Sequence, residues 1–192
     1  TFVRLGFMMN TKVIAGLGTI MFGAHQILMN LMSLSFSFGD GFGIAASSLV
    51  GQNLGAKRPD LSIVYGKICQ RMSLISSSVL FFVFAFLGKP IVGLLSKNDP
   101  AIISVSATIL IAQSSQMVFM GALRGAGDTK YTAVVSMISI MLLRPISSYV
   151  FAFTMGLGLV GAWLGMVLDQ FLRLYLTYRR FSSGDWMKID IK

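Results

Sequence analysis

Five polar side chains share one face of the apolar stretch 25–54. They are Gln26, Asn30, Ser33, Ser37 and Asp40. Successive members are four, three, four and three residues apart, so a helix that turns about 100° per residue gathers all five within about 80°. Such groups can bind a cation, a proton or a polar substrate, whereas lipid leaves them without hydrogen-bond partners. We therefore expect this face to lie against protein or water.

Asp40 carries the strongest functional indication on this face. It lies inside a long apolar stretch with no basic residue close to it in the sequence. A carboxylate at membrane depth is costly in its charged form, and such residues commonly mark ion paths or proton relays. Asp40 is therefore a candidate for proton or cation coupling. An acid held by hydrogen bonds for structural reasons is the alternative, and the sequence leaves both open.

Two arginines in later stretches call for different interpretations. Arg144 precedes Pro145, and proline removes a backbone donor, so that a polar side chain or water can fill the resulting kink. Arg144 can face a cavity or extend to the membrane interface, and both remain open. Arg173 follows Asp169 by four residues, which predicts a structural ion pair on one helix face.

The remaining polar and small residues at membrane depth bear on helix packing. Lys12, Gln113 and Gln116 are consistent both with cavity lining and with hydrogen bonds between helices. Small residues recur at every fourth position of the stretch 25–54, and they are Gly39, Gly43, Ser47, Gly51 and Gly55. Such a repeat lets two helix backbones approach closely, and we favour this interpretation over a bend.

Helices that cross a membrane must position these residues. Of the 192 residues, 55% are hydrophobic and 12% are charged, about half the charged fraction of a soluble domain. Six stretches reach the roughly 20 apolar residues that span the hydrocarbon core. Their expected limits are 2–22, 25–54, 62–87, 100–123, 129–154 and 157–181. The predicted fold class is an all-α membrane protein, a six-helix transmembrane bundle in which Gly55 ends the second helix in a left-handed conformation and Asp128 caps the fifth.

Basic residues divide unequally between the two ends of these stretches. One end collects twelve of the 16 Lys and Arg, the other only Lys89 and Lys97. Basic loops remain in the cytoplasm, so we expect a multi-pass plasma-membrane protein with both termini of this chain cytoplasmic. Anionic lipid headgroups of the bilayer also account for the net charge of +9. We expect no nucleic-acid partner, because no basic face carries interleaved aromatic residues.

The sequence offers little for catalysis. One cysteine, Cys69, and one histidine, His25, provide neither a disulfide nor a set of zinc ligands. The run 125–130 lacks the spacing of a phosphate-binding loop, and no HExxH or GxSxG motif occurs. A membrane-embedded enzyme would need ionisable residues that meet at one depth, and Asp40 has no evident nucleophile or base partner. We expect no enzyme activity, no metal and no cofactor.

Several helix-end motifs resemble one transporter family. Two of them are Val50-Gly51-Gln52-Asn53-Leu54-Gly55-Ala56 and Leu123-Arg124-Gly125-Ala126-Gly127-Asp128-Thr129. Further matches are Ala24-His25-Gln26, Arg144-Pro145, Gly161-Ala162-Trp163-Leu164-Gly165 and Arg180-Phe181-Ser182-Ser183-Gly184-Asp185-Trp186. In type and order these motifs resemble those of the multidrug and toxic compound extrusion (MATE) transporters, over nearly the whole chain.

The resemblance implies one lobe of a larger transporter. The family has twelve helices in two six-helix lobes around a central cavity, and it exports organic cations in exchange for protons or sodium ions. This chain resembles the C-terminal lobe, helices seven to twelve, of a bacterial member, so its expected partners are the N-terminal lobe and a small organic substrate. The chain starts at Thr1 rather than Met, and we expect the beginning of helix seven to lie upstream.

The resemblance leaves the coupling ion open. Some members place a coupling glutamate early in helix seven, which corresponds to a position upstream of Thr1. Others place an aspartate in helix ten, where this sequence has Gln113 or nearby polar residues. Gln26, Asn30, Asp40 and Arg144 are then the candidate cavity residues, and the glycine-bearing loops are structural.

A lipid-linked saccharide flippase of the same wider superfamily is the alternative function. Such proteins need a cationic cavity for a pyrophosphate lipid, and Lys12 with Arg144 is compatible with one. The helix-end motifs favour drug export instead.

Overall fold

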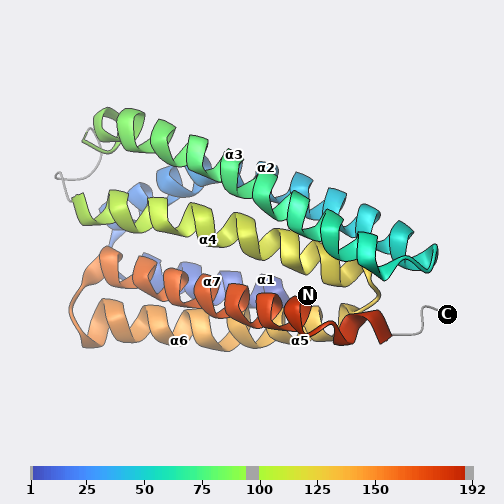
Figure 1. Ribbon diagram of the computed structural model, residues 1–192. Helices are drawn as coiled ribbons and strands as arrows, with labels where there is room; N and C mark the ends of the chain where they lie inside the picture. Colours follow the sequence, from blue (N-terminus) through green and yellow to red (C-terminus); the bar gives the residue numbers. More distant parts are fainter. Residues whose placement is uncertain (1, 94–99, 189–192) are drawn as a thin grey trace.

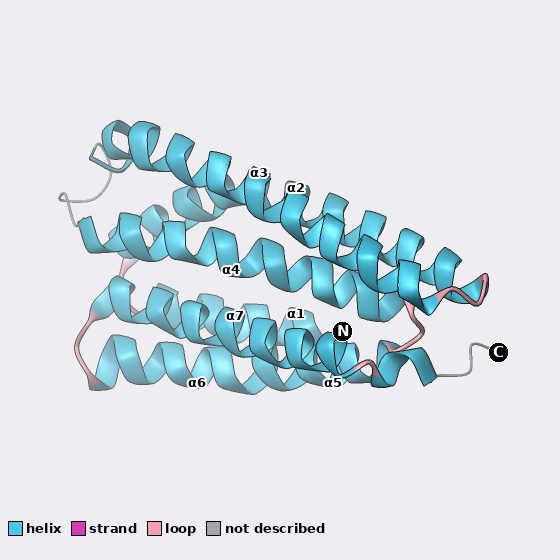
Figure 2. Ribbon diagram, in the orientation of Figure 1, coloured by secondary structure: helices cyan, strands magenta, loops and turns pink. Residues whose placement is uncertain are grey.

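The computed structural model describes residues 2–93 and 100–188, and within these ranges it contains helices and no strand. The α-helices are α1 (Phe2–Ala15), α2 (Thr19–Gly55), α3 (Pro59–Gly93), α4 (Pro100–Gly125), α5 (Thr129–Ile138), α6 (Arg144–Tyr149) and α7 (Gly158–Ser183). A π-helical segment, η1 (Ser139–Leu143), joins α5 to α6, and a second, η2 (Val150–Thr154), extends α6, so that the four form one continuous rod. A 3-10 turn, η3 (Asp185–Lys188), follows α7. Figure 2 shows the described loops in pink.

The helices form two layers (Figure 1). One layer contains α2, α3 and α4, and the other contains α1, α7 and the rod from α5 to η2. Helix α4 lies at the centre and packs against α2, α3 and α7. The α2–α3 and α4–α5 connections lie at the same end of the bundle as the end of α7, whereas the connection from η2 to α7 lies at the opposite end.

The helix limits differ from the expected stretches most clearly at the beginning of the chain. The predicted helix 2–22 is wrong, because α1 ends at Ala15 and α2 already begins at Thr19. Gly18 has a φ of 104°, a backbone conformation that favours glycine and interrupts the helix. Gly16 and Gly18 are the signal for this break in the sequence, but apolar residues continue on both sides of them, so hydrophobicity alone did not reveal it.

The other limits shift by smaller amounts. The expected helices 62–87, 100–123 and 157–181 lengthen to 59–93, 100–125 and 158–183, while the rod keeps the expected limits 129–154. The left-handed residue after α2 is Lys57, with a φ of 59°, and not Gly55. Asp128 stands at the N-cap position of α5, but its side chain makes no capping hydrogen bond; instead Arg180 Nε donates to its Oδ2 at 2.7 Å.

Close contact between α2 and α4 confirms the packing role of the small residues in α2. A Cβ atom added to Gly121 would overlap the carbonyl oxygen of Gly43, and one added to Gly125 would overlap that of Ser47. A Cβ on Gly51 would lie 2.8 Å from the carbonyl oxygen of Gly125. In lipid, such backbone proximity supplies the van der Waals contact that holds helices together.

Apolar packing divides into two clusters along the bundle. One contains Ile14, Leu110 and Trp163, and the other contains Val118, Leu123 and Trp186. In the part of the chain that the structure describes, two helices are long and apolar enough to cross a membrane, Thr129–Thr154 and Gly158–Ser183. The count of six spans therefore remains a prediction at this stage.

Candidate functional site

The predicted polar face of α2 lies on the surface of the bundle. Gln26, Asn30, Ser33, Ser37 and Asp40 are all exposed. Two hydroxyls bond to their own helix: Ser33 Oγ donates to the Asn30 carbonyl at 2.6 Å and Ser37 Oγ to the Ser33 carbonyl at 3.1 Å. The amides and the carboxylate are therefore the groups of this face that can bind a solute.

Asp40 lies at a cavity of about 290 Å³ between α2 and α4. The lining also includes Ser47, Ser48 and Arg124. Asp40 and Arg124 form no ion pair, since the four that the described residues make involve other groups. The sequence gave no indication of this cation near Asp40, because Arg124 comes from a different helix.

Arg144 is buried inside the bundle, which differs from both positions that the sequence left open. Its side chain neither lines an open cavity nor extends to the interface, since only 4% of the residue is exposed. Arg144 Nε and Nη2 donate to Asp169 Oδ2 at 2.9 and 2.5 Å. The guanidinium also lies 5.1 Å from the centre of the Phe7 ring, a cation–π distance.

The π-helical segment η1 positions Arg144. The backbone N–H of Arg144 donates to the Ser139 carbonyl, five residues back instead of the usual four. Pro145 follows and has no N–H to donate. This wider turn places Arg144 on the side of the rod that faces α7.

Arg173 binds the same carboxylate, as its spacing from Asp169 predicted. Arg173 Nη2 donates to Asp169 Oδ2 at 2.9 Å and to Gln170 Oε1 at 3.0 Å. Gln170 Nε2 in turn donates to Gln113 Oε1 at 3.4 Å. These five residues connect α6, α7 and α4, and we call them the buried polar network.

Charge in the buried polar network is unevenly balanced. Two guanidinium groups surround a single carboxylate, and Asp169 Oδ1 has no hydrogen-bond partner among the described residues. Desolvated charges are tolerated in an apolar interior only when they are paired. The pairing makes Arg144 and Asp169 fixed parts of the bundle and not groups free to bind a solute.

The six predicted site residues thus separate into three places. Gln26, Asn30 and Asp40 lie on the exposed face of α2. Arg144 and Gln113 belong to the buried polar network. Lys12 is exposed on α1. Periodicity revealed the α2 face, but Gln170 gave no signal, because its partners come from distant segments of the chain.

Comparisons with known proteins identify the family. The MatE family model matches residues 2–150. The chain belongs to the MatE family. Among its relatives, the probable multidrug resistance protein NorM of Thermotoga maritima is 30% identical over 195 residues, which cover 95% of this chain and 41% of that protein. The uncharacterized transporter YisQ of Bacillus subtilis is 27% identical, over 96% of this chain and 42% of that protein.

Solved structures of MatE transporters share the fold. A multidrug resistance MATE family transporter in an outward-facing conformation superposes with a TM-score of 0.83 at 18% identity, over 99% of this chain and 44% of that protein. A MOP superfamily transporter from Pyrococcus furiosus superposes with a TM-score of 0.79 at 19% identity. The MatE chain therefore spans about two-fifths of the length of these proteins and has the all-helical fold of one lobe of a membrane transporter.

Proposed function

We propose that this chain is the C-terminal lobe of a secondary transporter that exports small, amphipathic, cationic compounds from a bacterial cell in exchange for protons or sodium ions. Relatives named as multidrug resistance proteins support export, and the fraction of their length that the chain spans supports a single lobe. The observation that carries the proposal is the exposed polar face of α2, with Gln26, Asn30 and Asp40 directed out of the bundle.

Such a face suits the wall of a cavity between two lobes. Polar groups at membrane depth need water or protein around them. A second lobe that rocks against this one would enclose the polar face of α2 together with water. The buried polar network supports movement as a rigid body, because it joins α4, α6 and α7 by charged hydrogen bonds inside the lobe.

The charges around Asp40 support exchange of one cation for another. Asp40 supplies one carboxylate to the cavity, and Arg124 supplies a positive charge to the same cavity. A single carboxylate balances a single positive charge, and like charges repel, so this cavity favours only one further cation at a time. A cationic substrate and a coupling ion would then displace each other, as antiport requires.

The flippase alternative has less support. It needs a cationic cavity, for which Lys12 and Arg144 are the candidates. Arg144 is buried and bound to Asp169, which leaves Lys12 as the exposed member of that pair. We therefore retain cation export as the proposed function.

Substitution of Asp40 in the complete transporter tests the proposal. Asp40→Asn keeps the shape of the side chain and removes the charge, and we expect ion-driven efflux of a cationic dye to fall at least about tenfold, the effect of losing roughly 1.4 kcal/mol of binding. Efflux from inverted vesicles under an imposed proton or sodium gradient measures this loss. Asp60→Asn, at an exposed position in the first turn of α3, is the matched control and should leave efflux unchanged.

A structural role for Asp40 predicts a different pattern. Asp40→Asn would then transport almost normally, with an unchanged dependence on pH, while Asp40→Leu would yield little folded protein. That pattern would contradict the coupling role. Loss of efflux in both Asp40→Asn and Asp60→Asn would also contradict it, because the effect would not be specific to the cavity.

A further inference from the structure

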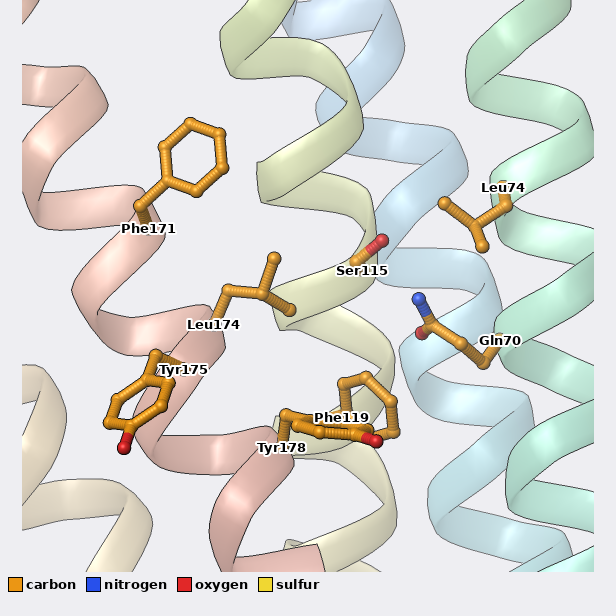
Figure 3. Close-up of a pocket in the computed structure, with 8 residues that line it drawn as sticks. All are labelled: Gln70, Leu74, Ser115, Phe119, Phe171, Leu174, Tyr175 and Tyr178. Atoms are coloured by element: carbon orange, nitrogen blue, oxygen red, sulfur yellow. The ribbon is translucent and has the colours of Figure 1, made fainter.

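An open groove crosses the face of the bundle between α3, α4 and α7. Its volume is about 470 Å³. Figure 3 shows the eight side chains that line it: Gln70, Leu74, Ser115, Phe119, Phe171, Leu174, Tyr175 and Tyr178. Several of them are well exposed, including Phe171 at 46% and Tyr175 at 57%.

The groove is apolar along most of its length and more polar at one end. Leu74 and Phe171 lie toward one end, and Tyr178 lies toward the other (Figure 3). Tyrosine prefers the boundary between hydrocarbon and headgroups. The amide of Gln70 projects toward Ser115 (Figure 3), and Gln70 Oε1 is buried without a hydrogen-bond partner in the described part of the chain.

Basic residues border the groove near this polar end. Lys67 precedes Gln70 by three residues and Arg71 precedes Leu74 by three, while Arg179 follows Tyr175 by four. Residues at these spacings share one helix face, so all three basic side chains lie on the two faces that border the groove. They are exposed, and none forms an ion pair with a described residue.

The groove faces away from the cavity at Asp40. Ser115 and Phe119 of α4 line the groove, whereas Met117 and Gly121 of α4 line the Asp40 cavity. A two-residue step turns a helix by about 200°, so α4 presents opposite faces to the two. If the polar face of α2 meets the second lobe, the groove meets the bilayer.

We propose that the groove binds an anionic phospholipid, with an acyl chain along Leu74, Phe171 and Leu174 and the headgroup phosphate between Lys67, Arg71 and Arg179. Charge complementarity identifies the occupant, because three unpaired cations border the tyrosine end of an apolar channel that is open to the membrane. Basic pockets between membrane helices bind anionic headgroups in this way. Gln70 Nε2 can donate a hydrogen bond to an ester or phosphate oxygen at the same depth.

Native mass spectrometry of the complete transporter tests this site. Phosphatidylglycerol and phosphatidylcholine with identical acyl chains are added to the purified protein, and the dissociation constant of each is measured. We expect tighter binding of phosphatidylglycerol by at least about tenfold, since each basic residue near the headgroup contributes roughly a factor of five. The triple variant Lys67→Gln, Arg71→Gln, Arg179→Gln should lose this preference.

A charge-matched control separates the groove from the general positive charge of this end. The variant Lys57→Gln, Arg58→Gln, Lys130→Gln removes three exposed cations at the same end of the bundle and should keep the preference. Equal loss in both triple variants, or no preference in the unaltered protein, would overturn the proposal. If the first triple variant does not fold, Lys67→Gln and Arg179→Gln are measured singly, and an unchanged preference in both would overturn it.

Two further probes identify the occupant. Inorganic phosphate at millimolar concentration should not displace the lipid, because it cannot fill the apolar part of the groove; full displacement would indicate a free-anion site and contradict the proposal. Phe171→Ala removes part of the apolar wall and no charge, so it should weaken the binding of both lipids by a similar factor. Unchanged binding of both lipids would also contradict the proposal. These measurements involve no transport, so their outcome is independent of the proposed efflux activity, although the placement of the groove in the bilayer rests on the lobe interpretation.

Discussion

Asp169 is the point at which two buried arginines from different helices meet. Its Oδ2 atom accepts hydrogen bonds from Arg144 and from Arg173, and none of the side-chain surface of Asp169 is exposed. Each guanidinium would be costly at this depth without the carboxylate between them, because an unpaired buried charge loses its hydration and gains nothing in return. The carboxylate therefore stabilises the packing of α6 against α7, which the hydrogen bond from Ser148 Oγ to the Ala162 carbonyl also supports.

We predict that Asp169→Asn destabilises the protein by roughly 3–5 kcal/mol, the cost of breaking a buried ion pair. The asparagine leaves two positive charges in an apolar interior without a counterion. Thermal unfolding of the purified protein in detergent measures the effect. Asp128→Asn breaks the partly exposed pair with Arg180 and should cost much less, so equal stability losses in the two variants would contradict the prediction.

The contacts that could be predicted from the sequence are those between residues of the same helix. The pair Asp169–Arg173 lies within one helix turn and was predicted correctly, and the polar face of α2 follows from period alone. Arg144 and Asp169 are 25 residues apart in the sequence, and Arg124 reaches the Asp40 cavity from another helix. No pattern within a single stretch can predict such contacts, because they arise only when the helices pack.

At the scale of elements, the α2–α4 interface depends on glycines of both helices. The sequence identified the repeat in α2, but its counterparts Gly121 and Gly125 in α4 became evident only from the contact itself. The early break between α1 and α2 was missed for a related reason, since Gly18 changes the backbone conformation without changing the apolar character of the chain.

We predict that Gly121→Leu destabilises the bundle by about 3 kcal/mol or more, at the upper end of the range for overpacking. The added side chain would collide with the backbone of α2 at Gly43, and backbone cannot rotate away as a side chain can. The midpoint of thermal unfolding measures the loss. Gly41→Leu, at a position where a Cβ meets no atom within 4 Å, is the control, and it should not lose stability, because leucine is a better helix former than glycine; an equal loss there would show that contact with α2 does not set the cost.

At the scale of the whole molecule, the two open surfaces of the lobe differ in chemistry. The α2 surface carries amides and a carboxylate, while the groove on the opposite side of α4 carries aromatic and aliphatic side chains with basic residues at one end. One lobe can thus face a wet cavity and a bilayer at once. The all-helical fold of a transporter lobe was predicted correctly from apolar stretches and helix-end motifs, the six membrane spans stay a prediction, and the relative rotation of the helices required the structure.

The orientation of the lobe in the membrane follows from its charge distribution and can be measured directly. The α2–α3 and α4–α5 connections lie at the basic end, and the connection from η2 to α7 lies at the other. We predict that the basic end is cytoplasmic.

In a Cys69→Ser background without other cysteines, Met155→Cys should react with a membrane-impermeant maleimide in intact cells. Ala56→Cys and Thr129→Cys should react only after the cells are permeabilised; all three positions are exposed, and none of the three changes removes a basic residue that could itself set the topology. Labelling of Ala56→Cys in intact cells would reverse the assignment and would place the basic end of the groove, with Lys67, Arg71 and Arg179, in the outer leaflet.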